Sequence, residues 1–104
     1  MNNLRFSENL TNAASIFNHF VECDSIFTPP LSTRVELLEY AQKLATKSDR
    51  FEIWQEERLV GLAAAYIRNS KSDNFGFISN LSVCKELQGR GLGRALIQKC
   101  IALA

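Results

Sequence analysis

The chain has 104 residues and a formal net charge of +1, so it is long enough for one small domain. Its 46% hydrophobic and 22% charged residues are typical of a globular protein rather than a disordered one. The near balance of 12 Lys and Arg against 11 Asp and Glu argues against nucleic acid or a membrane surface as a partner. The longest apolar run, 62–67, is far shorter than the roughly 20 residues that span a bilayer, and no apolar leader follows Met1. We therefore expect a cytoplasmic protein.

Two helices are predicted in the first half of the chain. Ser7 is placed as a cap for a helix over 8–22, where apolar residues recur at helical spacing. These apolar residues are Leu10, Ala13, Ala14, Phe17, Phe20 and Val21. After a loop that contains two prolines, Thr33 and Glu36 have the spacing of a capping box, which predicts a second helix over 33–47.

The second half of the chain predicts strands followed by a helix. Three segments are rich in strand-forming residues and are separated by polar turns: 51–55, 59–67 and 75–83. Gly61 marks an expected bulge. A last helix begins near Gly91, with Leu92, Leu96, Cys100 and Leu103 on one apolar face. The order helix, helix, strand, strand, strand, helix indicates an α+β or α/β fold in a single domain over 1–104. No stop signal closes the last helix, so we expect this domain to be incomplete.

Three cysteines, Cys23, Cys84 and Cys100, are odd in number and have neither CxxC nor zinc-site spacing. We therefore expect neither a disulfide framework nor a metal site, and we expect the three cysteines to be free thiols packed in the core. One alternative stays open, in which a cysteine acts as a nucleophile paired with His19, the single histidine.

Three glycines at alternate positions, Gly89, Gly91 and Gly93, stand between the last predicted strand and the last predicted helix. Glycine lets a ligand approach the backbone closely, and a helix N-terminus offers unpaired N–H groups with partial positive charge. With Arg90 and Arg94 beside them, these glycines predict a phosphate-binding site. The spacing excludes a P-loop and a dinucleotide fingerprint. The alternative is that the glycines only shape a loop.

The segment from Gln88 to Gly93 matches the Q/R-x-x-G-x-G/A signature, so the region 78–100 resembles the GNAT superfamily of acyl-CoA-dependent N-acyltransferases. The preceding Ile78-x-x-Leu81-x-Val83 is similar to the family's central strand. The resemblance implies a truncated GNAT-like fold: two N-terminal helices, three antiparallel strands and the coenzyme-binding helix. It also implies acetyl-CoA as co-substrate, with its acetyl group transferred to a primary amine by direct attack.

The same resemblance implies which residues bind the coenzyme. The main chain at the end of the central strand would bind the pantetheine arm, and the loop with the helix start would bind the pyrophosphate. These residues are Leu81, Ser82, Val83, Gln88, Gly89, Arg90, Gly91, Leu92, Gly93 and Arg94. The N–H group of Leu81 would also stabilise the oxyanion of the reacting thioester.

The acid and base of the reaction are left open. Asn80 stands near a bulge in the family's strand, where many relatives carry a carboxylate, and is expected to orient the substrate or a water. Three carboxylates remain as alternative bases: Glu22, Asp24 and Glu52. Tyr40 and Tyr66 lie on the wrong elements for the family's tyrosine acid, so we expect them to pack.

Two classes of function follow from these residues. The first is a catalytic N-acetyltransferase, and the second is a non-catalytic acyl-CoA-binding or pairing module that lacks half of the active site. A small interaction domain with structural glycines is a third reading. Because the central strand would form a sheet edge with unpaired backbone groups, a homodimer or pairing with a missing C-terminal segment is expected. The acceptor is left open among an amino sugar, a polyamine, an amino acid, an antibiotic and a protein N-terminus.

Overall fold

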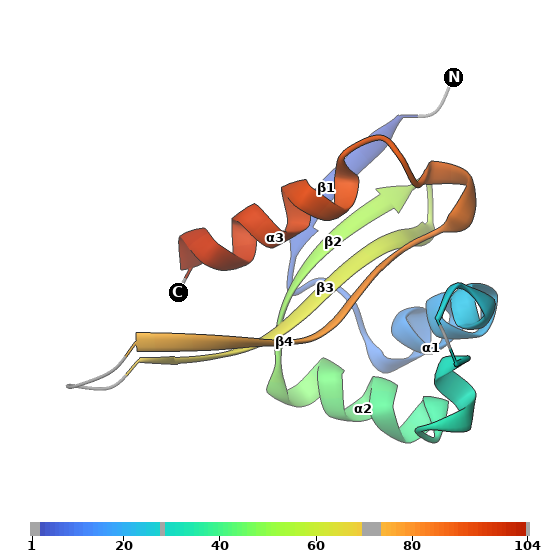
Figure 1. Cartoon of the computed structure of the whole chain (residues 1–104), viewed down its shortest axis with the longest axis horizontal. Helices are drawn as coiled ribbons and strands as arrows, with labels where there is room; N and C mark the ends of the chain where they lie inside the picture. Colours follow the sequence, from blue (N-terminus) through green and yellow to red (C-terminus); the bar gives the residue numbers. More distant parts are fainter. Residues whose placement is uncertain (1–2, 28, 70–73, 104) are drawn as a thin grey trace.

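The described residues contain four strands, which form one antiparallel sheet with α3 on one face and α1 and α2 on the other (Figure 1). The computed structural model describes residues 3–27, 29–69 and 74–103. The helices and strands are β1 (Leu4–Glu8), α1 (Ala13–Cys23), α2 (Leu37–Lys47), β2 (Asp49–Gln55), β3 (Arg58–Asn69), β4 (Asn74–Val83) and α3 (Leu92–Leu103). Short 3-10 turns are η1 (Asp24–Ile26), η2 (Leu31–Thr33) and η3 (Lys85–Leu87).

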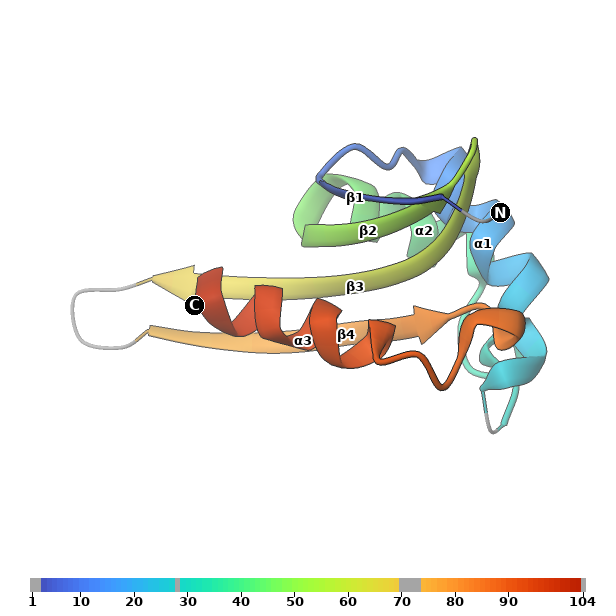
Figure 2. The same ribbon diagram turned by 90° about the horizontal axis from the view of Figure 1, so that it is seen from above.

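The strands follow the order β1-β2-β3-β4, which places β4 at one edge of the sheet (Figure 2). Two irregularities interrupt the register. Between β2 and β3, Val60 has no partner beside Gly61, which confirms the expected bulge at that glycine. Between β3 and β4, Ser79 has no partner because Ala64 pairs with Asn80 and Ala65 with Ile78. A bulge therefore lies next to Asn80, where the family resemblance implies one.

The structure adds a strand, β1, where the sequence predicts a helix cap. Ser7 lies in β1, and its hydroxyl donates to Glu52 Oε1 at 2.6 Å and accepts from Trp54 Nε1 at 2.7 Å. The prediction of Ser7 as a cap is wrong because these contacts with β2 come from residues more than 40 positions away. The predicted three-stranded segment is correspondingly a four-stranded sheet.

The first helix begins later than the predicted 8–22 and buries a different face. Asn12 is its cap, accepts from the N–H of Ser15 at 2.8 Å, and forms a capping box with that residue. The buried side chains are Ile16, His19, Phe20 and Cys23. Val21 is 52% exposed, so of the predicted apolar residues the helix buries fully only Phe20.

The second helix also starts later than the predicted 33–47. Thr33 lies in η2 and its hydroxyl donates to Pro30 O at 2.6 Å, so it does not cap α2. Instead Glu36 is itself the cap and accepts from the N–H of Glu39 at 2.6 Å. The predicted capping box is therefore wrong, because the chain makes one more short turn before the helix begins.

Two apolar cores lie on opposite faces of the sheet. On the α3 face, Leu96 and Cys100 are buried and Leu92 packs beside them, as the sequence predicts. On the face of α1 and α2, the core includes Ile16, Phe20, Leu44 and Leu62. The described helices include none with the length and apolar character needed to cross a membrane.

The connection from β1 to α1 is held on the sheet by a buried carboxylate. Glu52 of β2 accepts from the N–H of Leu10 at 3.0 Å, the N–H of Thr11 at 2.8 Å and the Thr11 hydroxyl at 2.5 Å. Arg50 Nε lies 3.8 Å from Glu52 Oε2, and its guanidinium donates to the Thr11 hydroxyl. Because Glu52 is fully buried, these contacts replace the water that its charge loses on folding.

Candidate coenzyme site

The loop from β4 to α3 leaves backbone N–H groups open. Gly89 and Gly91 have φ angles of 85° and 78°, which favour glycine over any residue with a side chain. The N–H of Ala95 donates to Gly91 O at 3.1 Å and makes the first bond of α3. The N–H groups of the preceding residues therefore have no partner within the helix and are available to an anion.

The three glycines expose their backbone. A Cβ atom built at Gly89, Gly91 or Gly93 meets no other atom within 4 Å, so the space beside each of them is open. Arg90 and Arg94 are exposed on the same loop and helix start. The loop thus combines open backbone donors with two guanidinium groups, which suits a phosphate ligand.

A cleft of about 330 Å³ lies next to this loop. Its walls come from the turn after α1, from β4 and η3, and from the glycine-rich loop with the start of α3. The lining residues are Ile26, Phe27, Leu81, Val83, Leu87, Gln88, Gly89, Gly91, Leu92 and Gly93. Seven of the ten residues that the resemblance assigns to the coenzyme line this cleft, while Ser82, Arg90 and Arg94 do not.

The edge of β4 next to the cleft presents backbone groups that are not bonded to another strand. The N–H of Cys84 donates to Val60 O at 2.8 Å, on the β3 side. Since bonding alternates along an antiparallel strand, the N–H groups of Leu81 and Val83 point to the opposite edge. Val83 O accepts there from Gln88 Nε2 at 3.0 Å. An extended ligand could therefore bond to this edge as an added strand does.

Asn80 and Ser82 point to the other face of the sheet. Both side chains are buried, and the Ser82 hydroxyl donates to Asn80 Oδ1 at 3.1 Å. His19 Nε2 of α1 lies 2.7 Å from the Ser82 hydroxyl oxygen, and His19 Nδ1 lies 3.1 Å from Leu59 O. The side chain of Asn80 is thus part of a hydrogen-bonded chain on the α1 side and does not line the cleft.

The three carboxylates left as alternative bases are each engaged elsewhere. Glu22 accepts from Arg58 Nε at 2.7 Å, and Glu52 is held by the β1–α1 connection. Asp24 accepts from the hydroxyl and N–H of Ser32, and these hydrogen bonds lower the pKa of its carboxyl. None of the three lines the cleft.

Two tyrosines approach the bulge in β4 from different elements. The Tyr40 hydroxyl of α2 donates to Ser79 O at 3.0 Å and lies 2.6 Å from Ser79 Oγ, while its ring stacks on Phe20. The Tyr66 hydroxyl of β3 is buried without a hydrogen-bond partner among the described residues. Burial, and secondarily the nearby Tyr40, raise the pKa of Tyr66. The expectation that Tyr40 packs is confirmed, but the sequence did not indicate its contact with β4.

The three cysteines are free and buried, as the sequence predicts. Cys100 of α3 packs in the core between this helix and the sheet. Cys23 Sγ, in contrast, lies 3.2 Å from Cys84 Sγ and 3.7 Å from His19 Nδ1. The sequence spacing of these residues contains no sign of the cluster, because it depends on how α1 packs against the end of β4.

Comparisons with known proteins agree with this arrangement. The model of the acetyltransferase (GNAT) family matches residues 13–104. No curated protein sequence matches the chain. Among solved structures, a possible acetyltransferase from Clostridium difficile 630 aligns with a TM-score of 0.73 and 13% identity, over 96% of this chain and 70% of that one.

Two further structures have the same fold. An aminoglycoside acetyltransferase from an uncultured soil metagenomic sample aligns with a TM-score of 0.67 and 19% identity, over 97% of this chain and 71% of that one. A Trypanosoma brucei acetyltransferase aligns with a TM-score of 0.68 and 20% identity, over 97% of this chain and 74% of that one. At these identities the likeness concerns the fold alone.

Proposed function

Because the chain belongs to the acetyltransferase (GNAT) family, we propose that residues 1–104 form the coenzyme-binding part of one N-acetyltransferase domain that uses acetyl-CoA. The observation that carries this proposal is the open backbone of the glycine-rich loop at the start of α3, beside the free edge of β4. The cytoplasmic setting that free thiols favour is part of the same proposal.

In this proposal the coenzyme lies along the edge of β4. Its pyrophosphate accepts from the open N–H groups at the start of α3, with Arg90 and Arg94 as further donors. Its pantetheine arm bonds to the outward backbone groups of Leu81 and Val83, as an added strand would. This orientation directs the thioester toward the bulge at Ser79.

The reaction we propose is direct attack of a primary amine on the thioester carbonyl. The new C–N bond forms as the C–S bond breaks, and the amine loses a proton while the leaving thiolate gains one. The N–H of Leu81 stabilises the oxyanion that develops on the carbonyl. Asn80 orients the amine substrate or a water. The Ser82 hydroxyl holds its side chain in place on the opposite face of the sheet.

One observation favours the alternative of a non-catalytic acyl-CoA-binding module. The carboxylates of Glu22, Asp24 and Glu52 are each bound to other groups, so none is free to accept a proton from an amine at the cleft. The two functions share the coenzyme and differ in turnover, so a chain that binds acetyl-CoA but releases no free coenzyme with any amine would be the binding module.

An amino sugar is one acceptor to include, since some neighbours of the same fold are aminoglycoside acetyltransferases.

Isothermal titration of the chain with acetyl-CoA tests the shared step, with NADH and ATP as control ligands. We expect micromolar affinity for acetyl-CoA and no heat from either control ligand. The Gly91→Glu variant should lose binding because it adds bulk and negative charge where the pyrophosphate lies. Gln42→Glu, which adds the same charge on an exposed position of α2, is the matched control. Unchanged affinity in Gly91→Glu would remove the loop from the proposal.

We also propose that the part of the β4 edge before the bulge at Ser79, which the coenzyme leaves free, pairs with a further strand, supplied by a second copy of the chain or by an additional segment. Among the described residues, β3 is the only strand paired with β4, and an unpaired edge strand invites such pairing. Sedimentation velocity at micromolar concentration should then show a dimer of this chain or, with a longer chain, a monomer. A stable, folded monomer of the 104-residue chain would contradict the pairing.

A further inference from the structure

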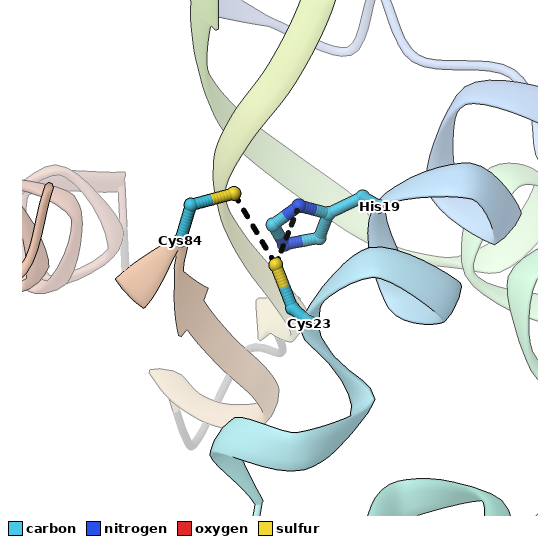
Figure 3. Close-up of side chains that lie close together, drawn as sticks. All are labelled: His19, Cys23 and Cys84. Carbon is cyan, nitrogen blue, oxygen red and sulfur yellow. Dashed lines mark hydrogen bonds between the residues drawn. The ribbon is translucent and has the colours of Figure 1, made fainter. Parts of the chain in front are cut away.

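Two thiols from distant parts of the chain meet between α1 and β4. Cys23 is the last residue of α1 and Cys84 directly follows β4, and their Sγ atoms lie 3.2 Å apart (Figure 3). The two residues are 3% and 1% exposed. His19 completes the cluster, since its ring nitrogen and both sulfurs lie within 4.8 Å of one another. A disulfide needs a sulfur separation of about 2.05 Å, so the pair requires an approach of little more than 1 Å.

The surroundings favour the thiolate form at Cys84 over that at Cys23. The hydrogen bond between them lowers the pKa of Cys84 and raises that of Cys23, and the nearby His19 and Arg58 further stabilise the Cys84 thiolate. Arg58 Nη2 donates to Cys84 Sγ at 3.7 Å. This combination of an activated thiolate beside a second thiol is typical of a redox-active pair.

The pair stands where the two walls of the cleft begin. Cys23 immediately precedes η1, and the cleft residues Ile26 and Phe27 follow in this turn and directly after it. On the opposite wall, Cys84 lies between the cleft residues Val83 and Leu87. A covalent bond between the two sulfurs would therefore draw the end of α1, and with it one wall, toward β4.

We propose that Cys23 and Cys84 are a reversible dithiol–disulfide pair, which a hydroperoxide oxidises and which narrows the coenzyme cleft when the disulfide forms. The formation of the bond is independent of the proposed function, whereas its effect on the cleft rests on the proposed coenzyme binding. A small thiol reductant restores the two cysteines.

The oxidation proceeds in two balanced steps. The Cys84 thiolate attacks one oxygen of hydrogen peroxide, the O–O bond breaks, and a sulfenic acid and, after proton uptake, a water are formed. The Cys23 thiol then attacks the Cys84 sulfur, forms the S–S bond and releases a second water. In sum, two thiols and one hydrogen peroxide give one disulfide and two waters, with two electrons passing from sulfur to oxygen.

A cavity borders two residues that contact the pair, His19 and Arg58. It has a volume of about 900 Å³, lies between α1 and the β2–β3 turn, and is lined in part by His19, Glu22 and Arg58. Arg58 is 41% exposed and covers Cys84, and it is held by ion pairs with Glu22 at 2.7 Å and Glu86 at 2.8 Å. Because these pairs are exposed and weak, Arg58 can move aside for a molecule as small as a peroxide.

Peptide mapping of the full chain tests the bond. The reduced protein is treated with hydrogen peroxide, its remaining thiols are alkylated, and it is cleaved with trypsin without reduction. We expect the peptides 6–34 and 72–85 to be joined by a disulfide that dithiothreitol breaks, with Cys100 alkylated in the peptide 100–104. Cys100 is an internal control because burial raises the pKa of its thiol, which has no sulfur beside it. Cys23→Ala should abolish the linkage, and Cys100→Ala should leave it unchanged.

Several outcomes would overturn the bond. These are two alkylated peptides after peroxide treatment, a linkage to Cys100, or a disulfide between two copies of the chain on a non-reducing gel. Zinc that protects both thiols of the reduced protein from alkylation, reversibly with a chelator, would overturn it in favour of a metal site at His19, Cys23 and Cys84.

Titration of the oxidised and reduced protein with acetyl-CoA tests the effect on the cleft. We expect the affinity for acetyl-CoA to be about tenfold weaker after oxidation and to be restored by dithiothreitol. Oxidation should not change the affinity of Cys23→Ala. Equal affinity of the oxidised and reduced protein for acetyl-CoA would overturn the proposal that the disulfide narrows the cleft. Binding to neither form would overturn the proposed function, while the linked peptides would still support the bond.

Discussion

Two connections in the described part of the molecule lead from a strand to a helix, and they differ in how the backbone N–H groups of the connection are bound. Before α1, the carboxylate of Glu52 accepts from the N–H groups of Leu10 and Thr11. Before α3, the space beside Gly91 and Gly93 is open, and no acidic side chain of the described residues is hydrogen-bonded to the N–H groups there. The chain thus supplies its own anion to the first connection and leaves the second for an anion from outside.

The largest expected effect comes from removing the internal anion. Glu52→Ala leaves the buried Arg50 without its carboxylate and the N–H groups of Leu10 and Thr11 without their acceptor, which should cost about 3–5 kcal/mol of the free energy of unfolding. Urea denaturation measures this loss. Glu57→Ala, at an exposed position of the β2–β3 turn, is the control and should change stability by less than about 0.5 kcal/mol. Equal unfolding midpoints for the two variants would mean that Glu52 does not hold the first connection.

A smaller effect is expected at the open connection. Gly91→Ala places a side chain at a φ of 78°, which should cost roughly 1–2 kcal/mol of stability. Gly93→Ala adds the same methyl group in equally open space without such a φ, and alanine favours a helix by up to about 1 kcal/mol over glycine. Denaturation of both variants should therefore separate them in sign. If both variants also weaken acetyl-CoA binding, the added methyl group hinders the approach of the ligand to the backbone. Equal stability of the two variants would contradict the strained backbone at Gly91.

The features that the sequence predicts are those set by local backbone requirements. The glycines at the start of α3 could be recognised because positive φ and open approach restrict the residue type at those positions. The bulge at Gly61 and the buried positions of α3 follow in the same way from local pattern. The fold class and the position of the open loop before α3 were therefore accessible from the sequence, whereas coenzyme binding at that loop stays a proposal.

The features that the sequence does not predict depend on contacts between distant residues. β1 is a short edge strand with no strong alternation, and it is stabilised by pairing with β2 and by the bonds of Ser7 to Glu52 and Trp54. The contact of Tyr40 with Ser79 joins residues 39 positions apart. Such contacts leave no signal in local periodicity, which is why the start of α1 and the surroundings of the bulge were predicted incorrectly or not at all.

Trp54 has a consequence for spectroscopy. It is the single tryptophan and is 8% exposed. Its Nε1 donates to Ser7 of β1, and the guanidinium of Arg5 lies 5.7 Å from its ring centroid. Its fluorescence therefore reports whether β1 is docked on the sheet. The protein carries an intrinsic optical probe for the part of the fold that lies before the matched residues 13–104.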